Sequence, residues 1–170
     1  MTGARYRVWQ FGRLLTSRLP AEALAEVRAW LTPQLFELFC RMTPAEQHHA
    51  YCVRQTLMTQ GYTDRDLLTA ALLHDVGKSK MPLAVWEKAA IVLGFKFMPR
   101  LAEQWGRAET VQPSWLARPF VVAVQHPAWG ADLVEAAGGS PVAVALIRCH
   151  QSKSKELELL SALQAADNSN

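Results

Sequence analysis

The sequence predicts an all-α protein that forms a single-domain helical bundle. Three observations support this fold class. Apolar residues recur with the spacing of helices rather than with the alternation of strands, and proline and glycine separate the segments that they form. No internal repeat or low-complexity tract interrupts this pattern. With 170 residues, of which 50% are hydrophobic, the chain can bury one sizeable core.

The first third of the chain contains three expected helices. They begin near Arg7, Pro20 and Pro33. Proline suits the first position of a helix, where its missing N–H would have no partner, and Thr32 suits the N-cap position before Pro33.

A longer helix should begin at Thr43. Thr43 and Glu46 have the spacing of a capping box, in which each side chain accepts a hydrogen bond from the backbone N–H of the other residue. We expect this helix to run to about Gln60, because the following Gly61 is of a type that commonly ends helices.

The next helix contains the run DLLTAALLHDVG. It should be opened by Thr63, with Asp66 three residues later, and closed by Gly77. Its leucine and alanine positions cover most of the circumference, which is typical of a helix buried in the middle of a domain. His74 and Asp75, near its end, should therefore emerge from the core.

The second half of the chain contains shorter segments. A less regular region is expected from about residue 79 to residue 113. Proline, glycine or serine then bound four further helical segments. These segments span residues 115–125, 128–137, 140–149 and 155–166.

The charge balance bears on the partners of the protein. The 18 lysine and arginine residues exceed the 15 aspartate and glutamate residues, which gives a net charge of +3 and a sequence pI of about 8.9. This balance favours anionic ligands such as phosphates. The basic residues are scattered, so nucleic acid is not expected as a partner. Cys40, Cys52 and Cys149 have no paired spacing, which is typical of reduced thiols in a cytoplasmic protein.

No membrane or export segment is expected. Arg5, Arg7 and Arg13 interrupt any apolar stretch at the start of the chain before it reaches the length of a signal peptide. The most apolar internal segment, residues 89–98, has about half of the roughly 20 residues that a spanning helix needs. Lys96 also lies inside this segment. We expect it in the core or at an interface, in a cytoplasmic protein.

Histidine and aspartate residues form a candidate metal-ligand set. His49, the pair His74-Asp75 and Asp167 offer imidazole nitrogen and carboxylate oxygen without thiolate, which favours Mn, Fe, Co, Ni or Zn, with Mg at the hard end. Consecutive residues on a helix point about 100° apart, so His74 and Asp75 can reach one ion only if it lies over a helix end. Gly77 supplies such an end.

These residues resemble the HD superfamily of metal-dependent phosphohydrolases, whose pattern is a histidine, a His-Asp dipeptide and a distant aspartate. The segment AALLHDVGK, residues 70–78, resembles the central motif of the family. HAYCV, from His49, resembles the first motif, and AADN, which contains Asp167, resembles the closing one.

A further segment resembles the HD-GYP branch of this superfamily. Residues 126–151 are similar to the stretch in which two additional histidines help to bind a second metal ion, which implies that role for His126 and His150. The chain lacks the Gly-Tyr-Pro motif of that branch, which argues against cyclic di-GMP as the substrate. The resemblance assigns residues 43–170 to the HD domain and leaves residues 1–42 as an N-terminal helical extension packed on the core.

The resemblance implies hydrolysis of a phosphoester in a small phosphorylated substrate, such as a nucleotide. One or two divalent ions would activate a water molecule for attack on phosphorus. Asp75 and Lys78 would be the catalytic residues, with the Lys78 ammonium facing the substrate phosphate. The implied metal ligands are His49, His74, Asp75, His126, His150 and Asp167.

Other interpretations are open from the sequence alone. The chain fits a non-catalytic regulatory module that binds a metal ion or a nucleotide, and the 89–98 segment fits a contact with a membrane or partner, including a homodimer. His126 could cap the helix before Pro127, and His150 could be a hydrogen-bonded surface histidine. Lys78 could simply be a cation favoured at a helix C-terminus.

Overall fold

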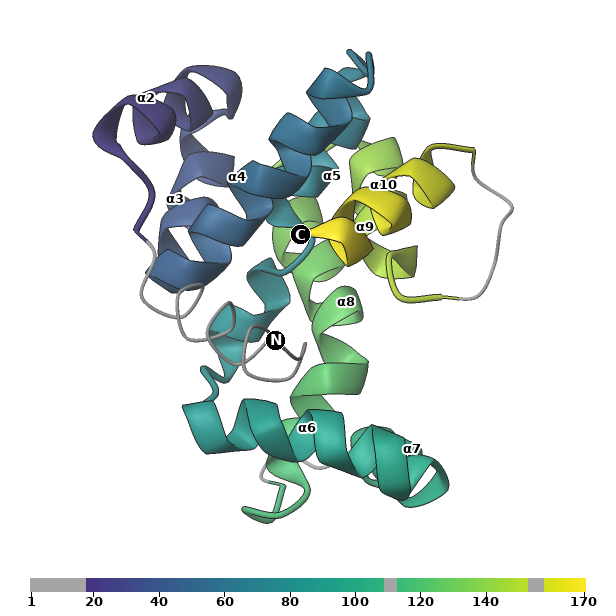
Figure 1. The fold of residues 1–170 in the computed structure, drawn as a ribbon. Coiled ribbons are helices and arrows are strands. Elements are labelled where there is room, and N and C mark those ends of the chain that lie inside the picture. Colours follow the sequence, from purple (N-terminus) through teal and green to yellow (C-terminus); the bar gives the residue numbers. More distant parts are fainter. Residues whose placement is uncertain (1–17, 109–112, 153–157) are drawn as a thin grey trace, which may run out of the picture.

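The computed structural model describes residues 18–108, 113–152 and 158–170, and every regular element in these ranges is helical (Figure 1). The predicted all-α bundle is therefore confirmed. The helix expected from Arg7 lies almost wholly outside the described residues. In chain order the elements are α2 (Ala21–Trp30), α3 (Pro33–Arg41), α4 (Pro44–Thr59), α5 (Arg65–Leu73), the 3₁₀-helix η1 (Val76–Lys80), α6 (Val85–Phe97), α7 (Pro99–Gly106), α8 (Arg118–Ala136), α9 (Pro141–Cys149) and α10 (Glu158–Ser169).

The predicted caps of α3 and α4 are confirmed. The Thr32 side chain accepts a hydrogen bond from the backbone N–H of Leu35 at 3.4 Å. Thr43 and Glu46 form both hydrogen bonds of the capping box, at 3.0 and 3.4 Å. Gly61 follows α4 with φ of +90°, a left-handed conformation that glycine adopts without strain. Local chemistry therefore sets where these helices begin and end.

The start of α5 differs from the prediction. Its N-cap is Asp64 rather than Thr63, and the Asp64 carboxylate accepts from the backbone N–H of Leu67 at 2.8 Å. A charged carboxylate makes a stronger cap than a hydroxyl at the positive end of the helix. Asp66 is used elsewhere, because its side chain accepts a hydrogen bond from the Ser140 hydroxyl at 2.6 Å.

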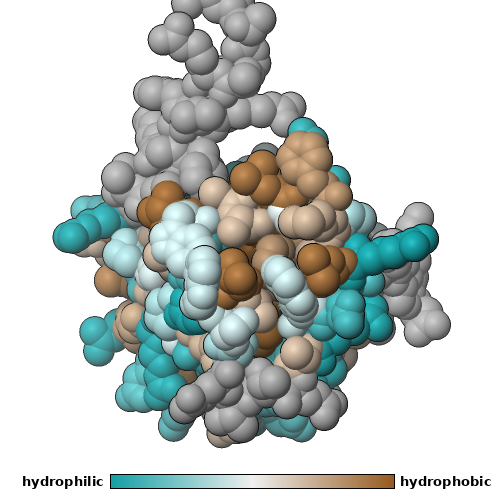
Figure 2. Space-filling view, turned by 90° about the horizontal axis from the view of Figure 1, so that it is seen from below, coloured by the Kyte–Doolittle hydropathy of each residue, from teal (hydrophilic) through white to brown (hydrophobic). Residues whose placement is uncertain are grey.

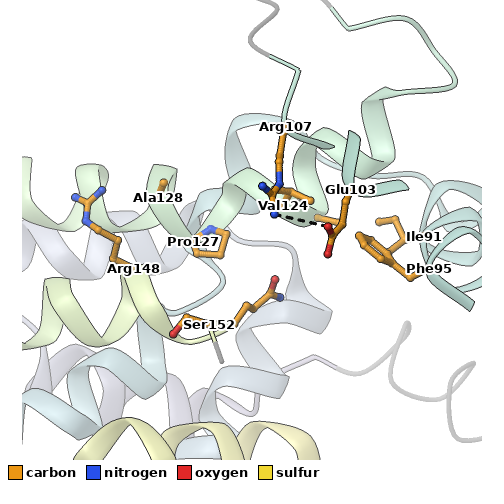
Figure 3. A pocket seen from close by; sticks show the side chains of 11 residues that line it. Ile91, Phe95, Glu103, Arg107, Val124, Pro127, Ala128, Arg148 and Ser152 are labelled. Carbon is orange, nitrogen blue, oxygen red and sulfur yellow. Dashed lines mark ion pairs between the residues drawn. The ribbon is translucent and has the colours of Figure 1, made fainter. Parts of the chain in front are cut away.

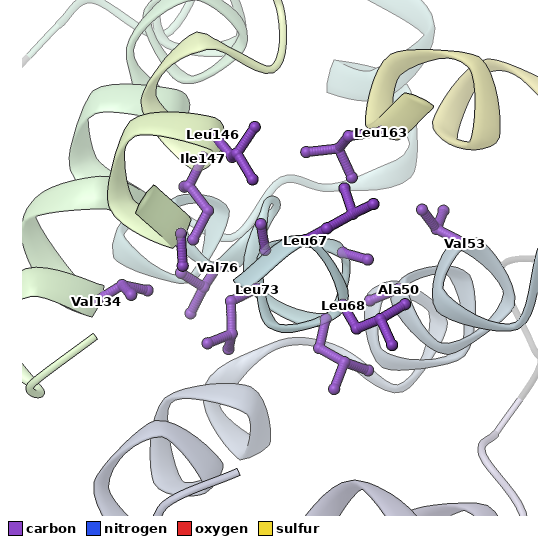
Figure 4. Close-up of a cluster of buried hydrophobic side chains, with 14 of the residues drawn as sticks. Ala50, Val53, Leu67, Leu68, Leu73, Val76, Val134, Leu146, Ile147 and Leu163 are labelled. Carbon is purple, nitrogen blue, oxygen red and sulfur yellow. The ribbon is translucent and has the colours of Figure 1, made fainter. Parts of the chain in front are cut away.

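Helix α5 lies at the centre of the bundle, as its composition predicts. All side chains from Leu67 to Leu73 are buried, and α3, α4, α9 and α10 pack around them (Figures 1 and 4). Apolar residues of α2 and α3 belong to the same core cluster as those of α5. The end of α5 therefore opens inside the bundle, so the residues that follow it are enclosed by neighbouring helices.

The expectation of an irregular region between residues 79 and 113 is wrong, because α6 and α7 lie there. Together they form the lower layer of the molecule, and the first half of α8 joins this layer to the bundle (Figure 1). Gly94 lets α6 approach α8, since a Cβ at this position would lie 2.3 Å from the Phe120 ring. The helical period of α6 is hidden in the sequence because apolar residues occupy both its buried and its exposed face.

The expected break at Pro127 is also absent. Helix α8 continues from Arg118 to Ala136 with Pro127 inside it. Proline usually ends or kinks a helix, because it lacks the N–H and its ring meets the carbonyl four residues earlier. Packing on α7, α9 and η1 supports α8 on both sides of this residue. Among the described residues, no helix is both long and apolar enough to cross a membrane.

Candidate metal centre

The structure brings all six predicted ligands together at the end of α5. They come from five parts of the chain. His49 lies in α4, His74 and Asp75 lie between α5 and η1, His126 lies in α8, His150 follows α9, and Asp167 lies in α10. They form two groups of three, and within each group the ligand atoms lie within 4.8 Å of one another.

The first group consists of His49, His74 and Asp167. The Asp167 Oδ1 atom lies 2.8 Å from His49 Nε2 and 3.5 Å from His74 Nε2. The His49 and His74 rings meet edge to face, with their centroids 5.4 Å apart. One carboxylate and two imidazoles therefore converge on a common point.

The second group consists of Asp75, His126 and His150, and all three residues are buried. Asp75 Oδ1 lies 3.4 Å from His126 Nε2. The His126 and His150 ring centroids are 5.2 Å apart. This group has the same chemistry as the first, with one carboxylate and two imidazoles.

Asp75 joins the two groups. Its Oδ1 atom faces His126, while its Oδ2 atom lies 3.7 Å from His74 Nε2. His74 and Asp75 are adjacent in the chain but belong to different groups. The sequence predicted a helix end at this pair, and α5 does end here, at Leu73 rather than at Gly77.

Gly77 has a different role from the one predicted. It lies inside η1, and a Cβ on it would come within 2.0 Å of the His126 carbonyl oxygen and 2.7 Å of the Gly130 nitrogen. Glycine therefore permits η1 to lie directly against α8. This close approach holds Asp75 beside His126.

The three buried histidines present the same ring nitrogen to the centre. In each, Nδ1 is bonded to a backbone carbonyl of the preceding turn, at 2.9 Å from His74 to Ala71, 2.9 Å from His126 to Val122 and 2.7 Å from His150 to Ile147. A carbonyl oxygen can only accept, so Nδ1 must carry the proton. In the neutral ring Nε2 then has a free lone pair, which is the arrangement of histidine ligands oriented by a backbone carbonyl.

Two of these Nε2 atoms have no hydrogen-bond partner among the described residues. They belong to His74 and His150, and both are buried. A buried polar atom without a partner costs about 1–3 kcal/mol. A cation between the rings would remove this cost, and nitrogen and carboxylate donors suit a divalent metal. The cluster that the two groups of ligands form can therefore bind a metal ion.

Opposite charges determine the protonation of the first group. Burial alone would lower the pKa of His74, but the carboxylates of Asp75 and Asp167 raise it above its usual value. Burial opposes ionisation of Asp167, yet the hydrogen bond from His49 and the nearby His74 imidazole hold its pKa well below the usual range. Asp167 is therefore a carboxylate at neutral pH, ready to ligate a cation.

The second group contains a histidine that resists protonation. Burial, followed by repulsion from His74, lowers the pKa of His150 to about 4. Burial would raise the pKa of Asp75, but Lys78 and His74 hold it well below the usual range. At neutral pH this group thus contains a neutral imidazole and a carboxylate, both in their ligating forms.

Lys78 lies at the edge of the centre, as predicted, but its ammonium is bonded to Asp75. Nζ donates to Asp75 Oδ2 at 2.6 Å, and 29% of the side chain is exposed. Burial would lower the pKa of Lys78, but Asp75 raises it above its usual value. The ammonium is therefore charged, partly accessible and held next to the ligands.

Gln151 was not singled out by the sequence. Its Nε2 lies 3.4 Å from His126 Nε2, so the amide covers one side of the second group. The same side chain lines a pocket of about 570 Å³ between α6, α7, α8 and the end of α9 (Figure 3). Phe95 and Pro127 supply apolar walls. Gln151 is thus the contact between this pocket and the centre.

Gln164 and His48 are neighbours of the ligands in the chain but have other contacts. Gln164 donates from Nε2 to the carbonyls of His150 and Ser152, at 3.1 and 2.8 Å, which ties α10 to the end of α9. Neither its residue type nor its spacing indicates this role. His48 belongs to neither ligand group, and its Nδ1 lies 3.7 Å from Cys52 Sγ.

Compared with protein-family models, curated proteins and solved structures, the chain gives no match.

Proposed function

We propose that the protein is a metal-dependent phosphohydrolase of the HD type, which hydrolyses a phosphoester in a small molecule such as a nucleotide. The observation that carries the proposal is the pair of three-ligand groups joined through Asp75. Two neighbouring metal positions are typical of sites that hydrolyse phosphoesters.

Each group of three ligands would hold one metal ion. His49, His74 and Asp167 would hold one divalent ion, and Asp75, His126 and His150 would hold the second. The donors suit Mn, Fe, Co, Ni or Zn, with Mg at the hard end. When bound, such ions supply an activated water molecule and neutralise charge on the phosphoester.

The residues around the ligands fit the same chemistry. The Lys78 ammonium is charged and lies next to Asp75, so it can stabilise negative charge that develops on a phosphoryl group. The pocket that Gln151 lines has apolar walls that can receive the remainder of the substrate, such as a nucleoside. Arg148, on the rim of this pocket, is paired with Asp132 at 2.8 Å, so we assign phosphate binding to Lys78 instead.

A hydrolysis screen tests the proposal. Protein stripped of metal is reloaded separately with Mn, Fe, Co, Ni, Zn or Mg and assayed with nucleotides, cyclic nucleotides and a generic aryl phosphate. We expect turnover that requires the metal and that Asp75→Asn abolishes. Asp132→Asn is the matched control, because this exposed carboxylate pairs only with Arg148 in the described structure.

The outcome also separates an enzyme from a regulatory module. Loaded protein that hydrolyses none of these compounds, yet binds a nucleotide in a calorimetric titration, would contradict catalysis and support a regulatory role. Loss of nucleotide binding in Asp75→Asn would then connect that role to the metal centre.

A further inference from the structure

The exposed face of α6 is apolar. In most surface helices the exposed face is polar and the apolar stripe is buried. Here the exposed residues of α6 are Val85, Trp86, Ala89, Val92, Leu93, Lys96 and Phe97, and Lys96 is the single polar one. Their spacing places them on one side of the helix, so they form a continuous stripe.

A second segment extends this stripe. Trp115 lies beside Trp86, with the ring centroids 6.2 Å apart, and 69% of Trp115 is exposed. We use the term apolar face for Val85, Trp86, Val92, Leu93, Phe97 and Trp115, which are each between 53% and 69% exposed. In the view from below, apolar residues gather in the middle of the surface and hydrophilic residues lie at its sides (Figure 2).

Positive charge accompanies the apolar face. Lys96 lies within the stripe, and its ammonium is 5.4 Å from the centroid of the Phe97 ring. Arg100 follows in α7 and is exposed. The one carboxylate of α6, Glu87, is buried and bonded to Arg118, so it does not offset these charges at the surface.

We infer that the apolar face docks on an anionic lipid bilayer. Large exposed apolar patches mark interaction sites in soluble folds. Tryptophan and phenylalanine beside lysine and arginine are the composition of helices that lie in a membrane interface, where apolar rings enter the acyl boundary and cations meet lipid phosphates. Lysine in such a face can extend its ammonium to the headgroups while its stem stays in apolar surroundings.

A second copy of the chain fits this face less well. In a two-fold symmetric contact the same surface meets itself, so Lys96, near the C-terminal end of the stripe, would be covered by apolar residues of the other copy. Burying two like charges without a carboxylate is unfavourable. An anionic bilayer instead pairs this charge with phosphate. The inference does not depend on the proposed hydrolysis.

Vesicle binding tests the inference. The full chain is sedimented with vesicles of phosphatidylcholine alone or of phosphatidylcholine mixed with phosphatidylserine, and tryptophan emission is recorded. We expect preferential binding to the phosphatidylserine vesicles with a blue shift, because Trp86 and Trp115 enter an apolar environment. Lys96→Glu should weaken this binding by more than about fivefold, since each basic residue contributes roughly that factor.

Apolar substitutions give the sharper test. Leu93→Ser with Phe97→Ser should reduce the partition coefficient about tenfold or more, because two large side chains no longer enter the bilayer. Val142→Ser is the matched control, since Val142 is 45% exposed on α9, outside the apolar face. Unchanged circular dichroism and metal content would show that the variants are folded.

Three outcomes would overturn the inference. The first is wild-type protein that binds neither kind of vesicle. The second is an equal loss of vesicle binding in the double variant and in Val142→Ser. A light-scattering mass that shows a dimer, dissociated by the same double substitution, would assign the apolar face to a second copy of the chain.

Discussion

Asp167 and His49 are 118 positions apart in the sequence, and their side chains meet at 2.8 Å between Oδ1 and Nε2. The contact joins α10, the last helix, to α4. Asn170 reinforces it by donating to the Thr56 hydroxyl at 2.9 Å. The first ligand group therefore exists only when the end of the chain has packed onto α4.

The first prediction concerns metal stoichiometry. Asp167→Ala removes the carboxylate of the first group, whereas a double substitution of His126 and His150 by alanine removes both imidazoles of the second. If the two groups hold separate ions, wild-type protein should contain about two metal ions and each variant about one. Elemental analysis of purified protein measures the content.

The variants distinguish two sites from one. Equal metal content in wild-type and His126/His150-substituted protein would show that these histidines bind no metal and have a structural role. Complete loss of metal in Asp167→Ala would instead indicate a single shared position. Circular dichroism provides the control for folding in both cases.

The second prediction concerns the contact between η1 and α8. In Gly77→Ala the new Cβ would meet the His126 carbonyl at 2.0 Å, so backbone must move. Overpacking of this kind typically costs about 1–3 kcal/mol, and we expect urea unfolding to show a loss of this size. Metal affinity of the second group should also fall, because Asp75 moves away from His126.

Gly130→Ala is the matched comparison for this prediction. It lies on the other side of the same contact, but its Cβ would meet nothing closer than the Gly77 nitrogen at 3.2 Å. The loss of stability should therefore be smaller than in Gly77→Ala. Equal losses in the two variants would show that space at Gly77 does not control the contact.

The sequence predicted those parts of the fold that depend on local chemistry. The capping box of Thr43 and Glu46, the helix end at Gly61 and the burial of the leucines and alanines of α5 each express a preference of neighbouring residues, and all are present. Pro127 is the counterexample. A local rule places a helix boundary there, and tertiary packing keeps α8 continuous.

Some residues of the candidate site could likewise be predicted from the sequence, and others could not. Its six ligands were identified by resemblance to a motif pattern, because spacing along the chain does not reveal that residues 118 positions apart meet. The roles of Gln151 and Gln164 follow from contacts between α8, α9 and α10, and no local pattern indicates them. The Lys78–Asp75 bond likewise depends on the 3₁₀ turn after α5, whereas the sequence predicts that the α-helix continues to Gly77.

The third prediction concerns the acid stability of the metal-free protein. The pKa of His150 is about 4 in the folded protein, against 6.5 as its ordinary value. At a pH between these two pKa values, His150 is protonated in the unfolded chain but neutral in the folded protein. The free energy of unfolding should therefore fall as the pH is lowered from 6.5 to 4. The contribution is on the order of 3 kcal/mol.

His150→Gln isolates this contribution. The raised pKa of His74 acts in the opposite sense, because its stabilisation is present below the unfolded value and is lost as the pH rises through the folded one. Subtracting the unfolding free energies of His150→Gln from those of wild-type protein at each pH removes most of this second effect. An identical pH slope in the two proteins would contradict the prediction.

The last prediction concerns Lys78 and rests on the proposed hydrolysis. The Lys78 ammonium is bonded to Asp75 Oδ2 at 2.6 Å, but Lys78 belongs to neither ligand group. Lys78→Ala should therefore retain bound metal near neutral pH and weaken turnover. Removing one electrostatic contact of this kind commonly costs on the order of 100-fold in rate.

The kinetic constants show how the ammonium acts. If Lys78 stabilises charge that develops in the transition state, kcat and kcat/KM should fall together; if it binds phosphate equally in both states, KM alone should rise. Lys80→Ala is the control, because Lys80 is an exposed lysine at the end of the same 3₁₀-helix. Loss of metal from Lys78→Ala at neutral pH would give the lysine a different role. It would then act through Asp75, by holding the pKa of that carboxyl low, rather than through the substrate.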